Sequence, residues 1–174
     1  GGSFLLSYPI SKFQRLEATA TLRNSNKEVI PEVIERKAVL FTNTLGWVMD
    51  NSIWGSTGPV DGLRALIYLG YTSDIKYSNV NYFSVIGDYR YYQRFAQTTL
   101  LAFRAAIFYN EGKEARLYYV GGSWDLRGWP RFGIRGEKIW LTSLEFRFPL
   151  IDQLGIRFPF FNLGFPGIRG AIFY

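Results

Sequence analysis

The sequence predicts an all-β fold, an antiparallel transmembrane β-barrel with about eight strands in this chain. Three observations predict it. Segment after segment alternates apolar and polar side chains, ionised side chains share one face of these segments, and aromatic residues make up 18% of the chain. Alternation with a period of two indicates strands, because successive side chains point to opposite faces of a sheet. Tyr and Trp favour surfaces that are apolar on one side and wet on the other, as at the rims of membrane barrels.

The clearest strand covers residues 138–148. Trp140 and Phe146 lie on one face, whereas Glu145 and Arg147 lie on the other. In a water-soluble sandwich the apolar face would be the core. In an outer-membrane barrel it would face lipid, and the charged face would line the lumen. This strand alone leaves both interpretations open.

Seven further segments carry the same signal, and no segment predicts a helix. They are residues 3–8, 13–24, 34–48, 63–72, 79–91, 97–109 and 168–174. Turn residues or prolines separate them and predict connections at residues 25–32, 50–62, 110–137 and 149–167. The connection at 110–137 is the longest and is rich in glycine around residues 121–129.

The ionised face decides between the two interpretations. The polar faces carry Arg15, Arg23, Arg64, Arg90, Arg104, Arg147 and Arg169 together with Glu17, Asp88 and Glu145. A soluble core could not bury so many charges at a cost of several kcal/mol each, so this face must be wet. Strands of ten residues or more are long for a sandwich but suit a tilted membrane span. We therefore predict a lumen lined by Arg15, Glu17, Arg64, Asp88, Arg90, Arg104, Arg147 and Arg169.

Composition limits the chemistry. The chain has 174 residues, enough for a single domain over residues 1–174, and contains neither cysteine nor histidine. This removes thiol nucleophiles, histidine bases and thiolate metal sites, so we expect no catalytic residue, no metal and no cofactor. The net charge is +6, but Lys and Arg are scattered along the strands rather than clustered, so nucleic acid is not an expected partner.

The sequence contains no targeting or membrane-spanning apolar run. No stretch reaches the 18 apolar residues or so of a transmembrane helix, and the chain begins Gly1-Gly2-Ser3 without a signal peptide. We expect a processed form or a piece of a longer protein.

Four motifs in order resemble the bacterial surface-antigen superfamily of outer-membrane barrels. They are Asp50 with Pro59-x-x-Gly62, the loop Gly121-Gly122 with Leu126-Arg127-Gly128-Trp129, the strand SLEFRFP at 143–149, and RGAIF at 169–173. This superfamily includes the central subunit of the barrel assembly machinery and the two-partner secretion translocators. The resemblance covers most of the chain.

The resemblance implies a location, partners and a role for the loop. It implies the bacterial outer membrane, a lipid bilayer, client outer-membrane proteins as partners, and insertion or translocation of proteins without bond chemistry. It also places Arg127 of the loop motif inside the lumen, held by acidic groups of the following strands. Glu145 matches one of these groups and lies on the predicted lumen face, so a charge-assisted pair is expected. Otherwise Arg127 is an ordinary loop arginine in solvent.

The sequence departs from the family pattern in two ways. It stops at Tyr174, before the lumenal aspartate of the family, and it has eight strands where the family barrel has sixteen. We therefore expect a fragment or an engineered piece, able to self-associate through its edge strands. A closed eight-stranded barrel has room only for its own side chains, so the loop would then lie outside on the extracellular side. In a wider assembly, with missing strands or a second copy, the loop would fold inward.

Three other functions remain as alternatives. The first is a structural barrel without transport activity. The second is a soluble barrel that binds an apolar ligand, which the charged interior disfavours. The third is an enzyme that uses Glu145 with Asp88 or Glu17 as a carboxylate pair, but neighbouring arginines explain these acids better.

Overall fold

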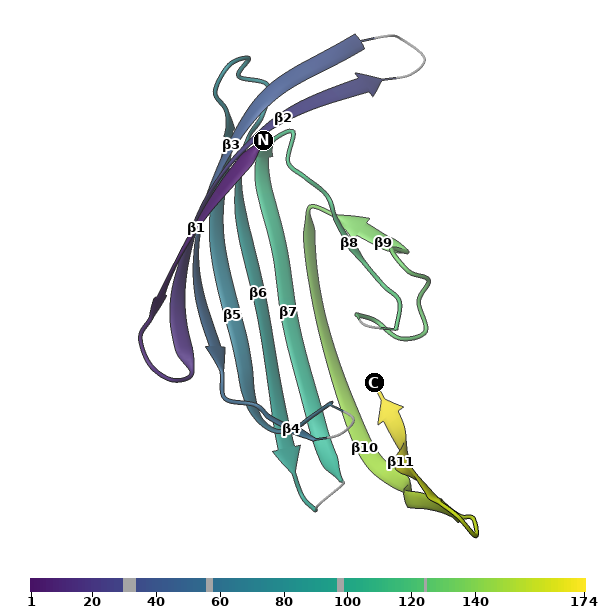
Figure 1. Ribbon diagram of the computed structural model, residues 1–174. Coiled ribbons are helices and arrows are strands. Elements are labelled where there is room, and N and C mark those ends of the chain that lie inside the picture. The colour runs from purple at the N-terminus through teal and green to yellow at the C-terminus, as the bar shows by residue number, and fades with distance from the viewer. Residues whose placement is uncertain (30–33, 56–57, 97–98, 124) are drawn as a thin grey trace.

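The chain folds into one long, curved antiparallel sheet. The computed structural model describes residues 1–29, 34–55, 58–96, 99–123 and 125–174. Eight main strands lie in the order β1-β2-β3-β5-β6-β7-β10-β11, so each pairs with the next main strand in the sequence. Figure 1 shows how they curve around a concave inner face. The predicted all-β antiparallel architecture with about eight strands is thereby confirmed.

The main strands are long, and three short strands accompany them. The main strands are β1 (Gly2–Pro9), β2 (Gln14–Val29), β3 (Ile34–Asp50), β5 (Gly58–Asp74), β6 (Asn81–Arg94), β7 (Leu100–Lys113), β10 (Lys138–Arg157) and β11 (Asn162–Phe173). The short ones are β4 (Ile53–Gly55), β8 (Tyr118–Val120) and β9 (Ile134–Gly136). β4 pairs with the start of β5, and β8 pairs with β9 inside the long connection.

The sheet is open in this structure. Among the described residues, β1 pairs only with β2, and β11 pairs only with β10. The two edges lie at opposite sides of the curved sheet (Figure 1). The structure therefore contains the wall of a barrel but not the closed barrel that the sequence predicts.

The predicted loop at residues 25–32 is wrong for residues 25–29, and residues 30–32 lie outside the described part. β2 and β3 remain paired as far as Val29 and Ile34, whereas β5 pairs with β3 only as far as Leu40. The far ends of β2 and β3 form a two-stranded ribbon that projects beyond the sheet (Figure 1). Neither face of this ribbon is buried, so its side chains need not alternate between apolar and polar. Without that alternation the sequence did not predict strands there.

Two other predicted connections also contain strands. In the segment 50–62, β4 and the first residues of β5 form a hairpin. In the segment 149–167, β10 continues to Arg157 and β11 begins at Asn162, so the connection is only residues 158–161. Pro149 is tolerated because β7 stops pairing with β10 at Arg147, and a β-bulge follows between Pro149 and Ile151.

The two faces of the sheet differ as the alternation predicts. On the outer face, Trp140 is 78% exposed, Leu45 67% and Ile67 49%, although all three are apolar. On the inner face, the side chains of Arg104, Asp88 and Glu145 are only 11–14% exposed. The molecule thus turns its large apolar side chains outward and its charges inward. In the described part of the chain, no helix has the length and apolarity to cross a membrane.

Candidate functional site

The long connection between β7 and β10 folds over the inner face of the sheet. Figure 1 shows the β8–β9 hairpin beside β10, on the concave side. Val120 of β8 packs against Ala106 of β7 and Leu141 of β10, with Phe108 and Ile139 around them. These are inward-pointing side chains, so the sheet and the loop share a small apolar cluster.

Asn110 holds the base of this loop. Its side chain is 2% exposed, and its backbone N–H donates to the Glu137 carbonyl over 2.8 Å. The Asn110 amide donates to the Arg116 carbonyl and accepts from the Tyr118 hydroxyl over 2.9 Å. Burial raises the pKa of Tyr118, which keeps this hydroxyl protonated as a donor. One buried residue therefore ties both ends of the connection to β7: its side chain holds the start and its backbone N–H holds the end.

The loop motif forms a compact turn at the tip. The Leu126 N–H donates to the Gly122 carbonyl over 3.0 Å, and the Gly122 N–H donates to the Trp129 carbonyl over 3.1 Å. Gly121 has a φ of 125°, and a Cβ there would lie 2.4 Å from the Pro130 carbonyl oxygen. Only glycine fits at that point. Trp129 remains 54% exposed beside the turn.

Two ion pairs join the tip to the sheet. In one of them the loop contributes the cation, and in the other it contributes the anion. Arg127 of the loop lies 3.4 Å from Glu145 of β10, and Asp125 of the loop lies 3.3 Å from Arg104 of β7. The Arg127 guanidinium also lies over the Phe173 ring, 5.5 Å from its centroid. The loop therefore contributes one cation and one anion, and the sheet contributes the oppositely charged partner of each. This reciprocity fixes the tip in two places.

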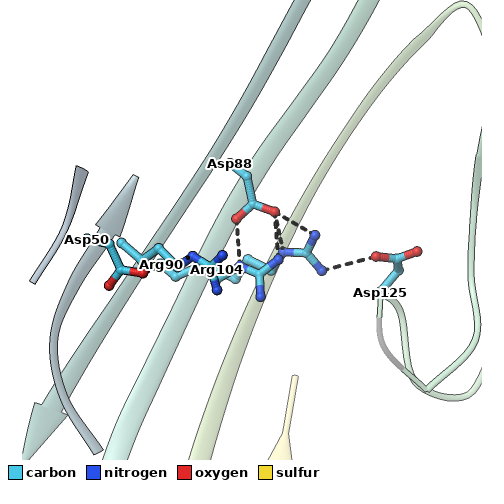
Figure 2. A network of polar contacts seen from close by, with 6 residues as sticks. Asp50, Asp88, Arg90, Arg104 and Asp125 are labelled. Carbon is cyan, nitrogen blue, oxygen red and sulfur yellow. Dashed lines mark hydrogen bonds and ion pairs between the residues drawn. The ribbon is translucent and has the colours of Figure 1, made fainter. Parts of the chain in front are cut away.

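A row of three arginines crosses the sheet below the tip. Arg64, Arg90 and Arg104 lie directly opposite one another on β5, β6 and β7. Like charges in such positions repel. Asp88 offsets this repulsion, because it accepts from Arg90 over 2.8 Å and from Arg104 over 2.7 Å (Figure 2). At the β5 end of the row, the carboxylate of Asp50 lies 3.5 Å from the guanidinium of Arg64.

The other predicted lumen residues lie on the same face but in separate places. Arg15 and Glu17 form a pair on β2, and Glu17 also accepts a hydrogen bond from Tyr68 of β5. Arg147 pairs with Glu145 over 2.8 Å. Arg169 lies opposite Pro149 in the β10–β11 register, on the face of Glu145 and Arg147.

Sequence reasoning missed Asp125 and Asn110. Asp125 lies two residues before Arg127, so its place in the motif could have indicated a second contact. Asn110 carries no such signal, because the sequence predicts a loop from residue 110 onwards and the partners of Asn110 lie further along the chain. The loop itself lies inward over an open sheet, and not outside as expected for a closed eight-stranded barrel.

The loop tip, the sheet and the β4–β5 hairpin line a partly open cavity of about 630 Å³. Val60 of the hairpin packs against Tyr92, Leu100 and Ala102, which brings the hairpin over the inner face. Trp54 and Pro59 of the hairpin and Leu126 and Arg127 of the loop tip are among its lining residues. Within the described residues, no cluster of acidic, histidine or cysteine side chains could hold a metal ion.

Comparison with known proteins identifies the family. Residues 12–165 match the Omp85 superfamily domain, which is most of the chain. A search among curated proteins finds no match. The matched range includes the loop motif, Glu145 and the arginine row. The chain therefore belongs to the Omp85 superfamily, whose members are non-enzymatic barrels of the outer membrane that insert or translocate proteins.

Proposed function

We propose that this chain forms part of the wall of an outer-membrane barrel that inserts or translocates other proteins, with its inner face lining the lumen. The observation that carries the proposal is the division of the sheet into an apolar outer face and an ionised inner face. Trp140, Leu45 and Ile67 point outward over strands long enough to span a bilayer, and no other element covers them in the described structure.

In the membrane the sheet belongs to a closed cylinder. The support is physical: edge strands carry unpaired N–H and C=O groups, and hydrocarbon offers these groups no partner. The free edges of β1 and β11 must therefore pair with further strands. Strands of a client protein, or of a second copy of this chain, satisfy them equally well. Client entry would then begin by backbone pairing at an edge.

The loop acts as an inward-folded plug over the lumen wall. Arg127 is the lumenal arginine, and Glu145 is its acidic partner. The ion pair at 3.4 Å, the second pair between Asp125 and Arg104, and the apolar contacts of Val120 support this role. Together they hold the loop against strands β7 and β10.

The first experiment tests the membrane assignment. The purified chain is transferred from denaturant into plain buffer, uncharged detergent micelles or phosphatidylcholine vesicles. We expect β-structure and heat-modifiable migration on gels only with detergent or lipid. A chain that stays folded, dispersed and monomeric in plain buffer would overturn the proposal.

The second experiment tests the activity. Vesicles with and without the chain receive an unfolded outer-membrane protein, and its folding rate is measured. We expect faster folding with the chain present. A structural barrel without transport activity is the second candidate, because the loop covers the inner face and narrows any passage. It predicts an unchanged folding rate and no leakage of a vesicle-trapped dye.

A further inference from the structure

The ends of β10 and β11 extend beyond the wall of the sheet. β7 pairs with β10 only as far as Arg147, whereas β10 and β11 stay paired as far as Arg157 and Asn162. A β-bulge between Pro149 and Ile151 lies at the root of this extension, and bulges bend and twist a strand. Figure 1 shows the extension projecting from the end of the sheet opposite to the one where the long connection leaves β7. Past Arg147, no third strand pairs with it in the described part of the chain.

Three phenylalanines belong to the turn of this extension, residues 158–161, which we call the phenylalanine turn. The Phe158 N–H donates to the Phe161 carbonyl over 2.9 Å, and the two rings stack with their centroids 4.6 Å apart. The turn is therefore held by its own contacts. All three rings are nevertheless exposed, and Phe160 is 96% exposed. Large apolar side chains that gather at one exposed place mark an interaction surface.

Exposed apolar side chains also connect the phenylalanine turn to the wall. They are Ile168 and Ile172 on β11 and Leu150 and Ile156 on β10. Between residues 153 and 168 the only ionisable side chain is that of Arg157, directly before the turn. The apolar surface of the wall thus continues to the turn, and a single cation interrupts it.

We propose that the phenylalanine turn inserts into the headgroup region of the bilayer that the sheet spans. This inference rests on the proposed membrane-spanning role of the sheet. The bilayer is the nearest apolar phase, because β10 and β11 are themselves strands of the wall. Segments that lie in the membrane interface combine apolar or aromatic side chains with Lys or Arg, and they bury their apolar side by about 5–10 Å. The turn, with Arg157 beside it, has this composition. It would anchor the end of the wall that lies opposite to the long connection.

A fluorescent label at residue 160 tests the insertion. The chain contains no cysteine, so Phe160→Cys provides a single attachment point for a solvent-sensitive dye. The change removes little internal packing, because the Phe160 ring is almost wholly exposed. The labelled chain is folded into phosphatidylcholine vesicles, with or without lipids that carry a nitroxide quencher. We expect the quencher to reduce the emission, and to do so more when it lies near the headgroup than near the methyl end of the acyl chain.

Phe132→Cys is the matched control, because Phe132 is an exposed phenylalanine of the connection that folds over the inner face. Its label should keep its emission in the same vesicles. Trp140→Cys labels the outer face of the wall, and its emission should fall if the sheet spans the bilayer. Heat-modifiable migration on gels verifies that each labelled variant is folded.

The three labels separate the inference from the assignment on which it rests. A quenched label at residue 140 with an unquenched one at residue 160 would overturn the insertion of the turn and leave the membrane assignment standing. The turn would then lie in water, where it could contact a protein. Equal quenching at residues 132 and 160 would also overturn the inference. An unquenched label at residue 140 would overturn the membrane assignment itself.

Discussion

At the scale of single residues, two carboxylates of the inner face, Asp88 and Glu145, each pair with two guanidinium groups. Asp88 takes Arg90 and Arg104, and Glu145 takes Arg147 and Arg127. A charge that is removed from water must be matched by a partner, and here the arginines are the more numerous. The stability of the folded sheet therefore depends strongly on these few carboxylates.

Replacing Asp88 with Asn should expose this dependence. The change leaves Arg90 and Arg104 side by side without their common partner, so we expect a loss of about 2 kcal/mol in unfolding free energy. Urea unfolding in lipid vesicles measures it. Glu111→Gln is the control, because its pair with Lys138 is more than half exposed, and such pairs contribute at most about 1 kcal/mol. Equal effects of the two changes would contradict this account.

Gly46 provides space for the Tyr68 ring on the neighbouring strand. A Cβ at Gly46 would lie 2.3 Å from a ring carbon of Tyr68, so Gly46→Ala must displace the ring and its hydrogen bond to Glu17. We expect a loss of about 1–3 kcal/mol, as for overpacking in a core. Gly155→Ala is the control, since its Cβ meets no atom within 4 Å. The same unfolding measurement compares the two, and a harmless Gly46→Ala would refute the steric argument.

Asp74 makes stability depend on pH at the end of β5. Its carboxylate is buried and accepts from the backbone N–H groups of Val39, Lys76, Tyr77 and Asn79. Burial alone would raise the pKa of Asp74, but these four donors outweigh it and lower the pKa from 3.8 to about 2. The stabilising effect is therefore complete above about pH 4 and is lost as the pH falls towards about 2.

Unfolding of the parent and of Asp74→Asn should be compared from pH 6 to pH 2. We expect the parent to be the more stable above pH 4 and the difference to shrink as Asp74 becomes protonated. A constant difference across this range would show that the ionised carboxylate is not responsible.

At the scale of elements, the loop is held at its base by hydrogen bonds and at its tip by charges. Asn110 ties the base, whereas Arg127 and Asp125 tie the tip to two different strands. The long strands β7 and β10 supply the partners of both ion pairs at the tip.

The double variant Arg127→Gln with Asp125→Asn should loosen the tip while the sheet remains folded. Amide hydrogen exchange in residues 121–129 should become about tenfold faster, which corresponds to about 1.4 kcal/mol. Each single variant should produce a smaller change. Arg131→Gln is the control, because Arg131 contacts Phe132 within the loop. Unchanged exchange in the double variant would show that the tip is held by other contacts.

At the scale of the whole molecule, the sheet separates two environments. Its outer face is apolar and no layer covers it among the residues that the structure describes, whereas its inner face carries the ionised groups and the loop. This arrangement is the reverse of a soluble protein, in which large apolar side chains are buried. Family membership indicates the outer membrane, and the apolar outer face of the sheet independently indicates a membrane environment.

Placing a charge on each face in turn tests this arrangement. Ile67→Arg puts a cation on the outer face near the middle of β5, and we expect a loss of about 2–4 kcal/mol in vesicles. Thr44→Arg, on the inner face of β3, should cost much less because that face is wet. Unfolding free energies in phosphatidylcholine vesicles compare them. Equal costs would contradict a lipid-facing outer surface.

Much of the fold could be predicted because alternation is a local signal. The alternation of Trp140 and Glu145 assigns their faces from neighbours in the sequence alone. The strand ends at residues 149–157 and 162–167 were missed, because they extend beyond β7 and no longer divide apolar from polar. The pair of Asp125 with Arg104 was missed as well, since a contact between a loop and a distant strand leaves no periodic pattern.

The sequence by itself determined which side chains lie on the apolar outer face and which lie on the charged inner face, because a strand has a period of two and each face has one character. Only the tertiary structure decided that the loop lies inward and that Asp88 and Glu145 are each shared between arginines. These contacts depend on the curvature of the sheet, which brings distant strands and the loop to one place.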